Sequence, residues 1–362
     1  MMKKLLSKSH FYHASLLLFI CFFILTAAVK NHSPDRENNG GSGQKLLLFV
    51  FGDSYADTGN KMKANASSWK PPYGSTFPGK PSGRFSDGRV LTDFLAKHVG
   101  VKSPIPYRWM KKKGSRARLE DGVNFAYGGT GVFDTLVAEP NMTSQIRSFR
   151  RLVHDSVFNQ SQVQSSGVFF VTLAGNDYSA FLAKGGTPQG LPAFISSVVN
   201  QLAVNLKFLY DHGARKVGVT SLEPLGCLSR VTVHSSFREC NASQNVAVNV
   251  HNQLLQEAVE RLNNQTNSST FVLLDLYSTF TRVIEQKNVA PGSMVFQTPL
   301  KPCCMGTSDE HYCGSVDENG AKLYTVCSDP NAAFFWDGAH PTQAGWASVY
   351  SSLKPTLQQM LA

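Results

Sequence analysis

Short apolar runs recur along the chain and predict buried β-strands, because a strand covered on both faces has no polar side. The runs are residues 45–51, 122–126, 167–173, 216–221 and 270–276. Stretches with apolar residues at helical spacing separate them, and residues 192–212 are typical because His212-Gly213 follows as a stop signal. Strands alternating with helices predict a parallel sheet covered on both faces. Ligands bind such sheets beyond the carboxyl ends of the strands, so chemistry is expected directly after the runs.

Polar blocks occur where this rule places them. The first run leads into Phe-Gly-Asp-Ser-Tyr-Ala-Asp-Thr-Gly-Asn at residues 51–60, and the second into Asn-Phe-Ala-Tyr-Gly-Gly-Thr-Gly at 124–131. The third ends in Leu-Ala-Gly-Asn-Asp at 173–177, and Trp-Asp-Gly-Ala-His-Pro-Thr stands at 336–342. Each block alone has an ordinary explanation, such as a helix N-cap at Ser54, a turn at Gly128-Gly129 or a surface histidine at His340. Their coincidence at successive strand ends favours catalysis.

The four blocks, in this order, resemble the GDSL family of SGNH hydrolases, and specifically its large branch of secreted plant esterases and lipases. Residues 72–77, 83–89 and 302–304 match that branch as well, so the resemblance covers essentially the whole mature chain. It implies a three-layer α/β/α sandwich of the flavodoxin-like kind, with a central parallel sheet of about five strands, formed by a single domain at residues 45–362. One departure is Tyr55, which stands where the name-giving tetrad has leucine, and we expect it to affect packing or the pocket wall at most.

The resemblance also assigns roles to residues. Ser54 matches the nucleophile, His340 and Asp337 match its catalytic partners, and Ser54, Gly129 and Asn176 match the donors of the oxyanion hole. The assignment of Gly129 is the least distinct because Gly128 is adjacent. No metal and no cofactor are expected.

General chemistry supports these roles. A serine hydroxyl is a weak nucleophile that needs a base, and a carboxylate fixes the tautomer of that base. The spacing of Asp337 and His340 fits one helical turn or a tight loop, and Pro341 is predicted to open the following helix. The G-x-S-x-G elbow of α/β-hydrolases is absent around Ser54. Asp57, Asp87 and Asp177 are interpreted as capping or turn-forming.

The N-terminus predicts export. Lys3, Lys4 and Lys8 precede an apolar run that begins at Ala14 and closes in small residues, which predicts a signal peptide at residues 1–28, followed by a flexible leader at 29–44. A retained membrane anchor is the competing interpretation, but the run of about 16 residues is shorter than the roughly 20 that a spanning helix needs. The predicted location is extracellular, in the cell wall or apoplast.

Cysteines and glycosylation sequons agree with export. Six cysteines follow the signal, and Cys227–Cys240 is the first pairing expected because it closes a short loop. The pairing of the other four, within residues 303–327, stays open, and a zinc site that includes His311 is the alternative. N-glycosylation sequons begin at Asn65, Asn141, Asn159, Asn241, Asn264 and Asn267.

Charge and composition limit the partners. The formal net charge is +10, and part of it is a basic run at residues 111–118. Export argues against nucleic acid, so this run is interpreted as a solvated loop, with contact to a cell-wall polysaccharide or lipid surface as the alternative. Hydrophobic residues make up 42% and charged residues 17% of the chain, which is typical of a globular protein. The oligomeric state is left open.

These observations together predict a secreted serine esterase or lipase. It would hydrolyse carboxylic acyl esters, either lipid-like or on an acylated plant polymer, through an acyl-Ser54 intermediate. Two alternatives keep the fold: an acyltransferase that uses the same site, and a catalytically silent binding protein.

Overall fold

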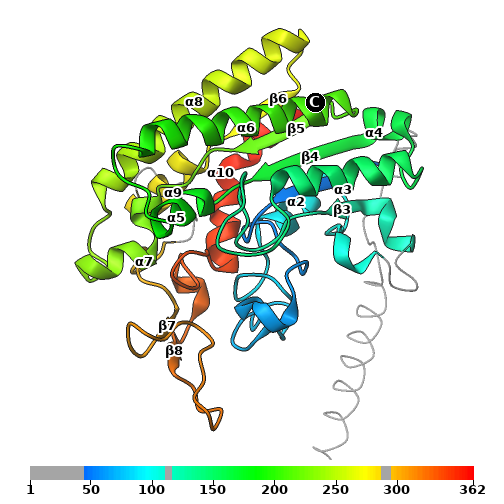
Figure 1. The fold of residues 1–362 in the computed structure, drawn as a ribbon. Coiled ribbons are helices and arrows are strands. Elements are labelled where there is room, and N and C mark those ends of the chain that lie inside the picture. Colours follow the sequence, from blue (N-terminus) through cyan, green and yellow to red (C-terminus); the bar gives the residue numbers. More distant parts are fainter. Residues whose placement is uncertain (1–44, 111–115, 287–294) are drawn as a thin grey trace, which may run out of the picture. The chain divides into compact units, whose positions relative to one another are not determined.

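The computed structural model describes residues 45–110, 116–286 and 295–362. The predicted signal peptide, the flexible leader and residues 111–115 of the basic run lie outside the described residues. One compact unit spans Lys45–Ala362. Its elements are drawn in Figure 1.

A six-stranded, fully parallel sheet forms the centre of this unit. The strands are β1 (Leu47–Gly52), β2 (Ile105–Pro106), β3 (Gly122–Asn124), β4 (Gly167–Thr172), β5 (Lys216–Thr220) and β6 (Phe271–Leu274). Their spatial order is β2-β3-β1-β4-β5-β6, with Leu48 of β1 paired to Gly122 on one side and to Val168 on the other. The five predicted runs are all strands. The prediction of about five strands missed only β2, which is two residues long and therefore gives no hydrophobic pattern.

Helices cover both faces of the sheet (Figure 1). The α-helices are α2 (Leu91–Val99), α3 (Met142–His154), α4 (Gln160–Ser166), α5 (Asn176–Ala183), α6 (Leu191–Asp211), α7 (Ser229–Thr232), α8 (Ala242–Thr266), α9 (Leu276–Glu285) and α10 (Gln343–Leu361). Side chains alternate along β1, so Leu47, Phe49 and Phe51 pack with α3, α6 and α8, while Leu48 and Val50 pack with α2, α9 and α10. These two apolar clusters are the two interfaces of a three-layer α/β/α sandwich, as predicted.

Short 3-10 helices occupy several of the loops. They are η1 (Lys63–Asn65), η2 (Ser67–Trp69), η3 (Tyr107–Trp109), η4 (Arg116–Asp121), η5 (Leu225–Cys227), η6 (Val233–Ser235) and η7 (Pro330–Ala332).

The strand order places a topological switch point at the carboxyl end of β1. From β1 the chain runs to β2 and then β3 on one side, and it returns to β4 on the other. The connections leave in opposite directions, so a crevice opens above β1 and its neighbours, where doubly wound folds bind ligands. Ser54 lies two residues beyond β1, and Asn176 opens α5 directly after β4.

A small disulfide-linked hairpin follows the sheet. Strands β7 (Cys304–Gly306) and β8 (Tyr324–Val326) pair antiparallel, and they carry the disulfides Cys303–Cys327 and Cys304–Cys313. The predicted Cys227–Cys240 disulfide is also present. All six cysteines of the described residues are thus oxidised, which leaves no thiolate for the zinc alternative.

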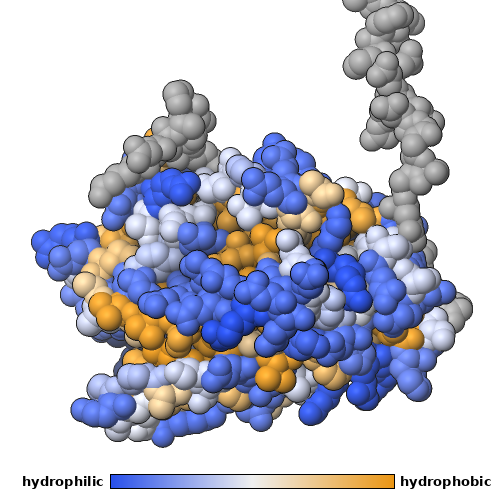
Figure 2. All heavy atoms as spheres, turned by 90° about the horizontal axis from the view of Figure 1, so that it is seen from above, coloured by the Kyte–Doolittle hydropathy of each residue, from blue (hydrophilic) through white to orange (hydrophobic). Residues whose placement is uncertain are grey.

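The surface of the folded unit is mixed in polarity. Figure 2 shows hydrophobic patches separated by hydrophilic atoms on the face seen from above. Large exposed apolar residues include Leu136, Val204, Val246 and Tyr312. Among the described residues, no helix is both long enough and apolar enough to cross a membrane.

Candidate active site

The nucleophile candidate lies on a tight turn that β1 feeds directly. Gly52 ends β1 at φ +141°, and a Cβ atom there would lie 2.0 Å from the Thr172 carbonyl oxygen of β4, so only glycine fits. The backbone N–H of Asp57 then donates to the Asp53 carbonyl oxygen at 2.9 Å and closes the turn. Ser54 is 7% exposed, and its hydroxyl lines a cleft.

Three predicted residues form one chain of hydrogen bonds across the sequence. Ser54 Oγ lies 2.8 Å from His340 Nε2, and His340 Nδ1 lies 2.8 Å from Asp337 Oδ1. With Asp337 ionised, Nδ1 donates to the carboxylate and Nε2 is left as the acceptor for the Ser54 hydroxyl. The ring of Phe85 stacks on His340 with centroids 5.1 Å apart, which limits the rotation of the imidazole.

Asp337 is held by donors from its own loop and from Tyr73. The backbone N–H groups of Ala339 and His340 each donate to Oδ1 at 2.9 Å, and the Tyr73 hydroxyl donates to Oδ2 at 2.7 Å. Burial alone would raise the pKa of Asp337, but the charge of His340 and these hydrogen bonds outweigh it, so the pKa lies below its ordinary value. The group is therefore a carboxylate at neutral pH.

The disulfide-linked hairpin of β7 and β8 binds the backbone ahead of Asp337. The backbone N–H of Cys303 donates to Phe335 O at 2.9 Å, and that of Cys304 donates to Trp336 O at 2.7 Å. Trp336 is fully buried and directly precedes Asp337. The disulfide-linked segment is thus joined to the backbone directly ahead of Asp337.

Two oxyanion candidates lie beside Ser54. Gly129 adopts φ +86° and lines the same cleft, as does Asn176. The side-chain amide of Asn176 donates to Asp53 Oδ2 at 2.9 Å and to Thr130 O at 3.0 Å. Both of its hydrogens are therefore engaged, and an oxyanion would have to take one of them over. A charged acceptor forms a stronger hydrogen bond than a neutral carbonyl, so this exchange favours the oxyanion.

Buried aspartates hold the strand-end loops together. Asp53 accepts from the N–H of Ala174 and from that of Tyr55, and burial raises its pKa to about 7. Asp57 accepts four backbone N–H groups, among them Gly59 and Gly128, and burial raises its pKa to about 6. Asp177 caps the backbone of Val132 and Phe133 in the same way. Asp87 accepts from the N–H of Gln343 at 2.7 Å.

Tyr55 does more than fill space. Its side chain is buried against Trp346, and its hydroxyl lies 3.0 Å from Glu223 Oε1 and 2.9 Å from Ala339 O, next to His340. Glu223 is 0% exposed, and burial raises its pKa to about 8. The Tyr55 hydroxyl is the donor in both contacts, to Glu223 Oε1 and to Ala339 O. Tyr55 also lines the cleft, so the expectation that it affects packing or the pocket wall is confirmed in part, but it missed the hydrogen-bonded link to the histidine loop.

The cleft that these groups surround is small. Its volume is about 150 Å³, and its walls include Ser54, Phe85, Gly129, Asn176, Leu228 and His340. Lys61, Arg230 and the buried carboxyl group of Glu223 also line it. Within the described ranges, no group of three or more His, Cys, Asp or Glu side chains is arranged to hold a metal ion.

Comparison with known proteins identifies the family. The family model described as GDSL-like Lipase/Acylhydrolase matches residues 48–352. The chain belongs to this family. A GDSL esterase/lipase of Arabidopsis thaliana is 52% identical over 347 residues, which is 96% of this chain and 96% of the relative. A second GDSL esterase/lipase from that plant is 53% identical over 313 residues, covering 86% of this chain and 88% of the relative.

This GDSL family member is a carboxylic ester hydrolase, as its family and relatives establish. Among solved structures, an acetylxylan esterase from Geobacillus stearothermophilus matches with a TM-score of 0.37 and 13% identity, covering 87% of this chain and 95% of that one. That likeness is too distant to say anything about the substrate.

Sequence reasoning on this GDSL protein missed the residues that support the triad. Tyr73 contacts Asp337 across 264 positions, and Glu223 contacts Tyr55 across 168. A lone acidic residue in the stretch Leu222-Glu223-Pro224, directly after a predicted strand, was a usable signal for the latter. The prediction for Pro341 was wrong: α10 begins at Gln343 with Thr342 as N-cap, because the Thr342 hydroxyl accepts from Gly345 N and proline has no comparable side-chain acceptor.

Proposed function

We propose that this protein is a serine esterase or lipase that cleaves carboxylic acyl esters through an acyl-Ser54 intermediate. The observation that carries the proposal is the 2.8 Å contact between Ser54 Oγ and His340 Nε2, with Asp337 bound to the other ring nitrogen. A serine, a base within hydrogen-bond reach and a carboxylate that orients the base are the parts that acyl transfer needs.

Acylation would proceed by transfer of the Ser54 proton to His340. Ser54 Oγ attacks the ester carbonyl carbon while Nε2 takes the hydroxyl proton, and the carbonyl electron pair moves to oxygen. The tetrahedral intermediate collapses, the ester C–O bond breaks, and the leaving alkoxide takes the proton from Nε2. Asp337 stays ionised throughout and stabilises the imidazolium that forms.

Deacylation repeats these steps with water as the nucleophile. Nε2 takes a proton from water, hydroxide adds to the acyl carbon, and the intermediate expels Ser54, which regains its proton. The backbone N–H groups of Ser54 and Gly129 and the amide of Asn176 would stabilise both oxyanions. Loss of one such donor typically costs about 10²–10³ in rate.

A fluorophosphonate probe on purified protein tests the nucleophile. Wild-type protein should be labelled at Ser54 and should hydrolyse 4-nitrophenyl acetate, while Ser54→Ala should lose both. Ser196→Ala is the matched control, because this exposed hydroxyl lies on α6. Absence of labelling would favour the catalytically silent binding protein. Acyl transfer faster than hydrolysis when a polyol is supplied would favour the acyltransferase.

We further propose that the protein is exported to the extracellular space and glycosylated. Three disulfides in the described residues fit an oxidising compartment. Of the sequon asparagines, Asn159, Asn241, Asn264 and Asn267 are exposed, whereas Asn141 is half-buried and its Nδ2 donates to Asp134. The side chain of Asn65 lies outside what the structure describes.

Export is tested by expressing the full chain with a C-terminal tag in plant cells. The protein should appear in the extracellular fluid, start after residue 28, and lose mass on treatment with a peptide N-glycosidase. A tagged protein that stays inside the cells with its first residues intact would contradict the proposal.

A further inference from the structure

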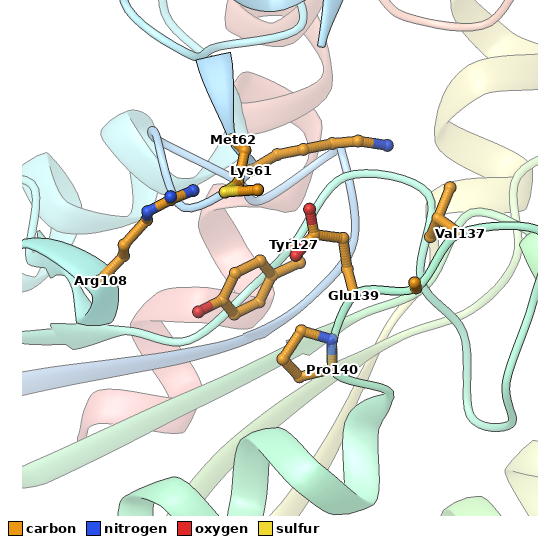
Figure 3. Close-up of a pocket in the computed structure, with 8 residues that line it drawn as sticks. Lys61, Met62, Arg108, Tyr127, Val137, Glu139 and Pro140 are labelled. Carbon is orange, nitrogen blue, oxygen red and sulfur yellow. The ribbon is translucent and has the colours of Figure 1, made fainter. Parts of the chain in front are cut away.

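A second and larger cavity adjoins the catalytic cleft. Its volume is about 450 Å³, compared with about 150 Å³ for the cleft around Ser54. Figure 3 shows its walls, which come from four separate segments. They are Lys61 and Met62 in the loop after β1, Arg108 in η3, Tyr127 after β3, and residues 137–140 ahead of α3.

The two cavities meet at the oxyanion-hole backbone. Lys61 lines both of them. A Cβ atom on Gly129 would lie 3.1 Å from a methyl group of Val137 and 3.3 Å from Lys61 Nζ, so these two side chains lie against Gly129. The larger cavity therefore begins next to the proposed oxyanion donor. The cleft holds little more than the ester group itself, so the rest of a substrate has to extend beyond it.

The charges of the larger cavity are unbalanced. Lys61 and Arg108 contribute two cations, and Glu139 contributes the one carboxylate among the lining residues. Lys61 Nζ donates to Gly128 O at 2.9 Å, and Arg108 Nη1 donates to Asn60 O at 3.3 Å. Ammonium has three hydrogens and guanidinium has five, so both keep donors for a ligand. In Figure 3, Arg108 and Glu139 enter from opposite sides, with the ring of Tyr127 between them.

Apolar surface completes the site. The ring of Tyr127 and the side chains of Met62, Val137 and Pro140 line the same space as the charged groups. Cations beside an aromatic face and aliphatic groups suit a ligand with an anionic group next to a ring or short hydrocarbon. The exposed residue Arg230 adds one more cation to the lining of the catalytic cleft.

We propose that this cavity is a substrate subsite for an anionic group, carboxylate or phosphate, carried a few atoms from the ester that Ser54 attacks. The inference rests on the proposed function and specifies its substrate class. Arg108 forms an ion pair with the anionic group, and Lys61 contacts the part of the substrate that lies between this group and the ester. Glu139 lowers the affinity for the anionic group because like charges repel.

Matched ester pairs test the subsite. One pair is a monoacylglycerol and the lysophosphatidate of the same chain; the other is an acetylated methyl galacturonoside methyl ester and its free acid. At low ionic strength, the wild-type protein should have a KM roughly threefold to tenfold lower for the anionic member of at least one pair. The pair that shows the preference identifies phosphate or carboxylate as the natural group.

Charge variants of the wall then assign the preference to this cavity. Arg108→Gln should raise the KM of the anionic ester roughly threefold to tenfold and leave its kcat and the neutral ester nearly unchanged. Arg108→Lys should keep most of the preference, and Glu139→Gln should lower the KM of the anionic ester. Arg261→Gln, on the exposed face of α8, is the matched control and should change neither.

Two outcomes separate failure of the subsite from failure of the proposed function. If Ser54 is labelled and 4-nitrophenyl acetate is cleaved, but neither pair shows an anionic preference, the subsite is overturned and the esterase stands. The same holds if Arg108→Gln changes both members of a pair equally. If the folded wild-type protein shows neither labelling nor cleavage of any ester, both proposals fail.

Discussion

Asp337 lies in the loop that carries His340, Glu223 is linked to the same loop through Tyr55, and the pKa values of these two buried carboxyl groups shift in opposite directions. Asp337 accepts hydrogen bonds from two backbone N–H groups, from Tyr73 and from His340, and its pKa lies below the ordinary value. Glu223 has the Tyr55 hydroxyl as a partner of Oε1, while its Oε2 has none among the described residues. Burial raises its pKa to about 8.

The difference shows that the supply of donors decides whether a buried carboxyl is charged. Asp337 is surrounded by donors and serves as the anion that orients and stabilises His340. Burial favours the neutral form of Glu223, and its Oε1 accepts from the Tyr55 hydroxyl, which also binds the same loop at Ala339 O. In the proposed mechanism, Asp337 supplies negative charge beside His340, whereas Glu223 helps to position the loop that carries His340.

Asp337→Asn should have the largest effect, because it removes the charge and keeps the shape. We expect kcat to fall by about 10⁴, since the neutral amide no longer fixes the tautomer of His340 or stabilises the imidazolium. The measurement is kcat on 4-nitrophenyl acetate, with circular dichroism to confirm folding. Glu223→Gln is the matched control and should retain activity within about threefold. Equal losses in the two variants would contradict the comparison.

Tyr55→Leu restores the residue of the name-giving tetrad and should be next in size. It leaves Glu223 buried without its partner and releases Ala339 O, so the free energy of unfolding should fall by about 1–3 kcal/mol. Denaturant unfolding measures the change. The double variant Tyr55→Leu/Glu223→Leu should lose less than the sum of the single variants, because the two side chains act as a pair. Additive losses would show that the hydrogen bond contributes nothing.

Tyr73→Phe should have a smaller effect, because it removes one of several donors to Asp337. The 2.7 Å hydrogen bond goes to a charged acceptor, so the pKa of Asp337 should rise while the group stays ionised at pH 7. We expect kcat to fall about threefold to tenfold with KM nearly constant. Tyr312→Phe, which alters an exposed hydroxyl, is the control. A loss as large as that of Asp337→Asn would mean that Tyr73 has a separate role.

The last prediction concerns the change of stability per pH unit. The pKa of Glu223 is about 8 in the folded state and 4.5 in its ordinary state, so the folded state holds a proton that the unfolded state releases. Wild-type stability should therefore fall as pH rises from about 4.5 to 8, by up to about 1 kcal/mol per pH unit from this group. Glu223→Gln removes the effect, so its stability relative to wild type should rise over that range. The raised pKa values of Asp53 and Asp57 change the stability of both proteins in the same way, so they cancel in the difference between wild type and Glu223→Gln. A constant difference between pH 5 and 8 would contradict a protonated Glu223.

The sequence predicted the sheet well because a buried parallel strand is a continuous apolar run. It missed β2, where two residues suffice for pairing with β3 and leave no pattern. Ser54 and Asn176 were predictable because the parallel topology brings the ends of β1 and β4 together, whereas His340 follows no strand of the sheet and lies in the loop ahead of α10. The contacts of Tyr73 and Glu223 with their partners could not be predicted, because they depend on loop conformations that leave no periodic pattern in the sequence. The cavity beside Gly129 depends on four loops for the same reason.

The hairpin that holds Phe335 and Trp336 through the backbone of Cys303 and Cys304 has a consequence for where the protein can mature. Its two disulfides include Cys303 and Cys304, whose backbone N–H groups bind the residues directly ahead of Asp337. A chain synthesised in a reducing cytoplasm would contain every side chain of the proposed mechanism. It would lack the disulfides that support the backbone ahead of Asp337. Expression in such a host is therefore expected to give protein with low activity per molecule. Expression through an oxidising compartment should raise the activity per molecule.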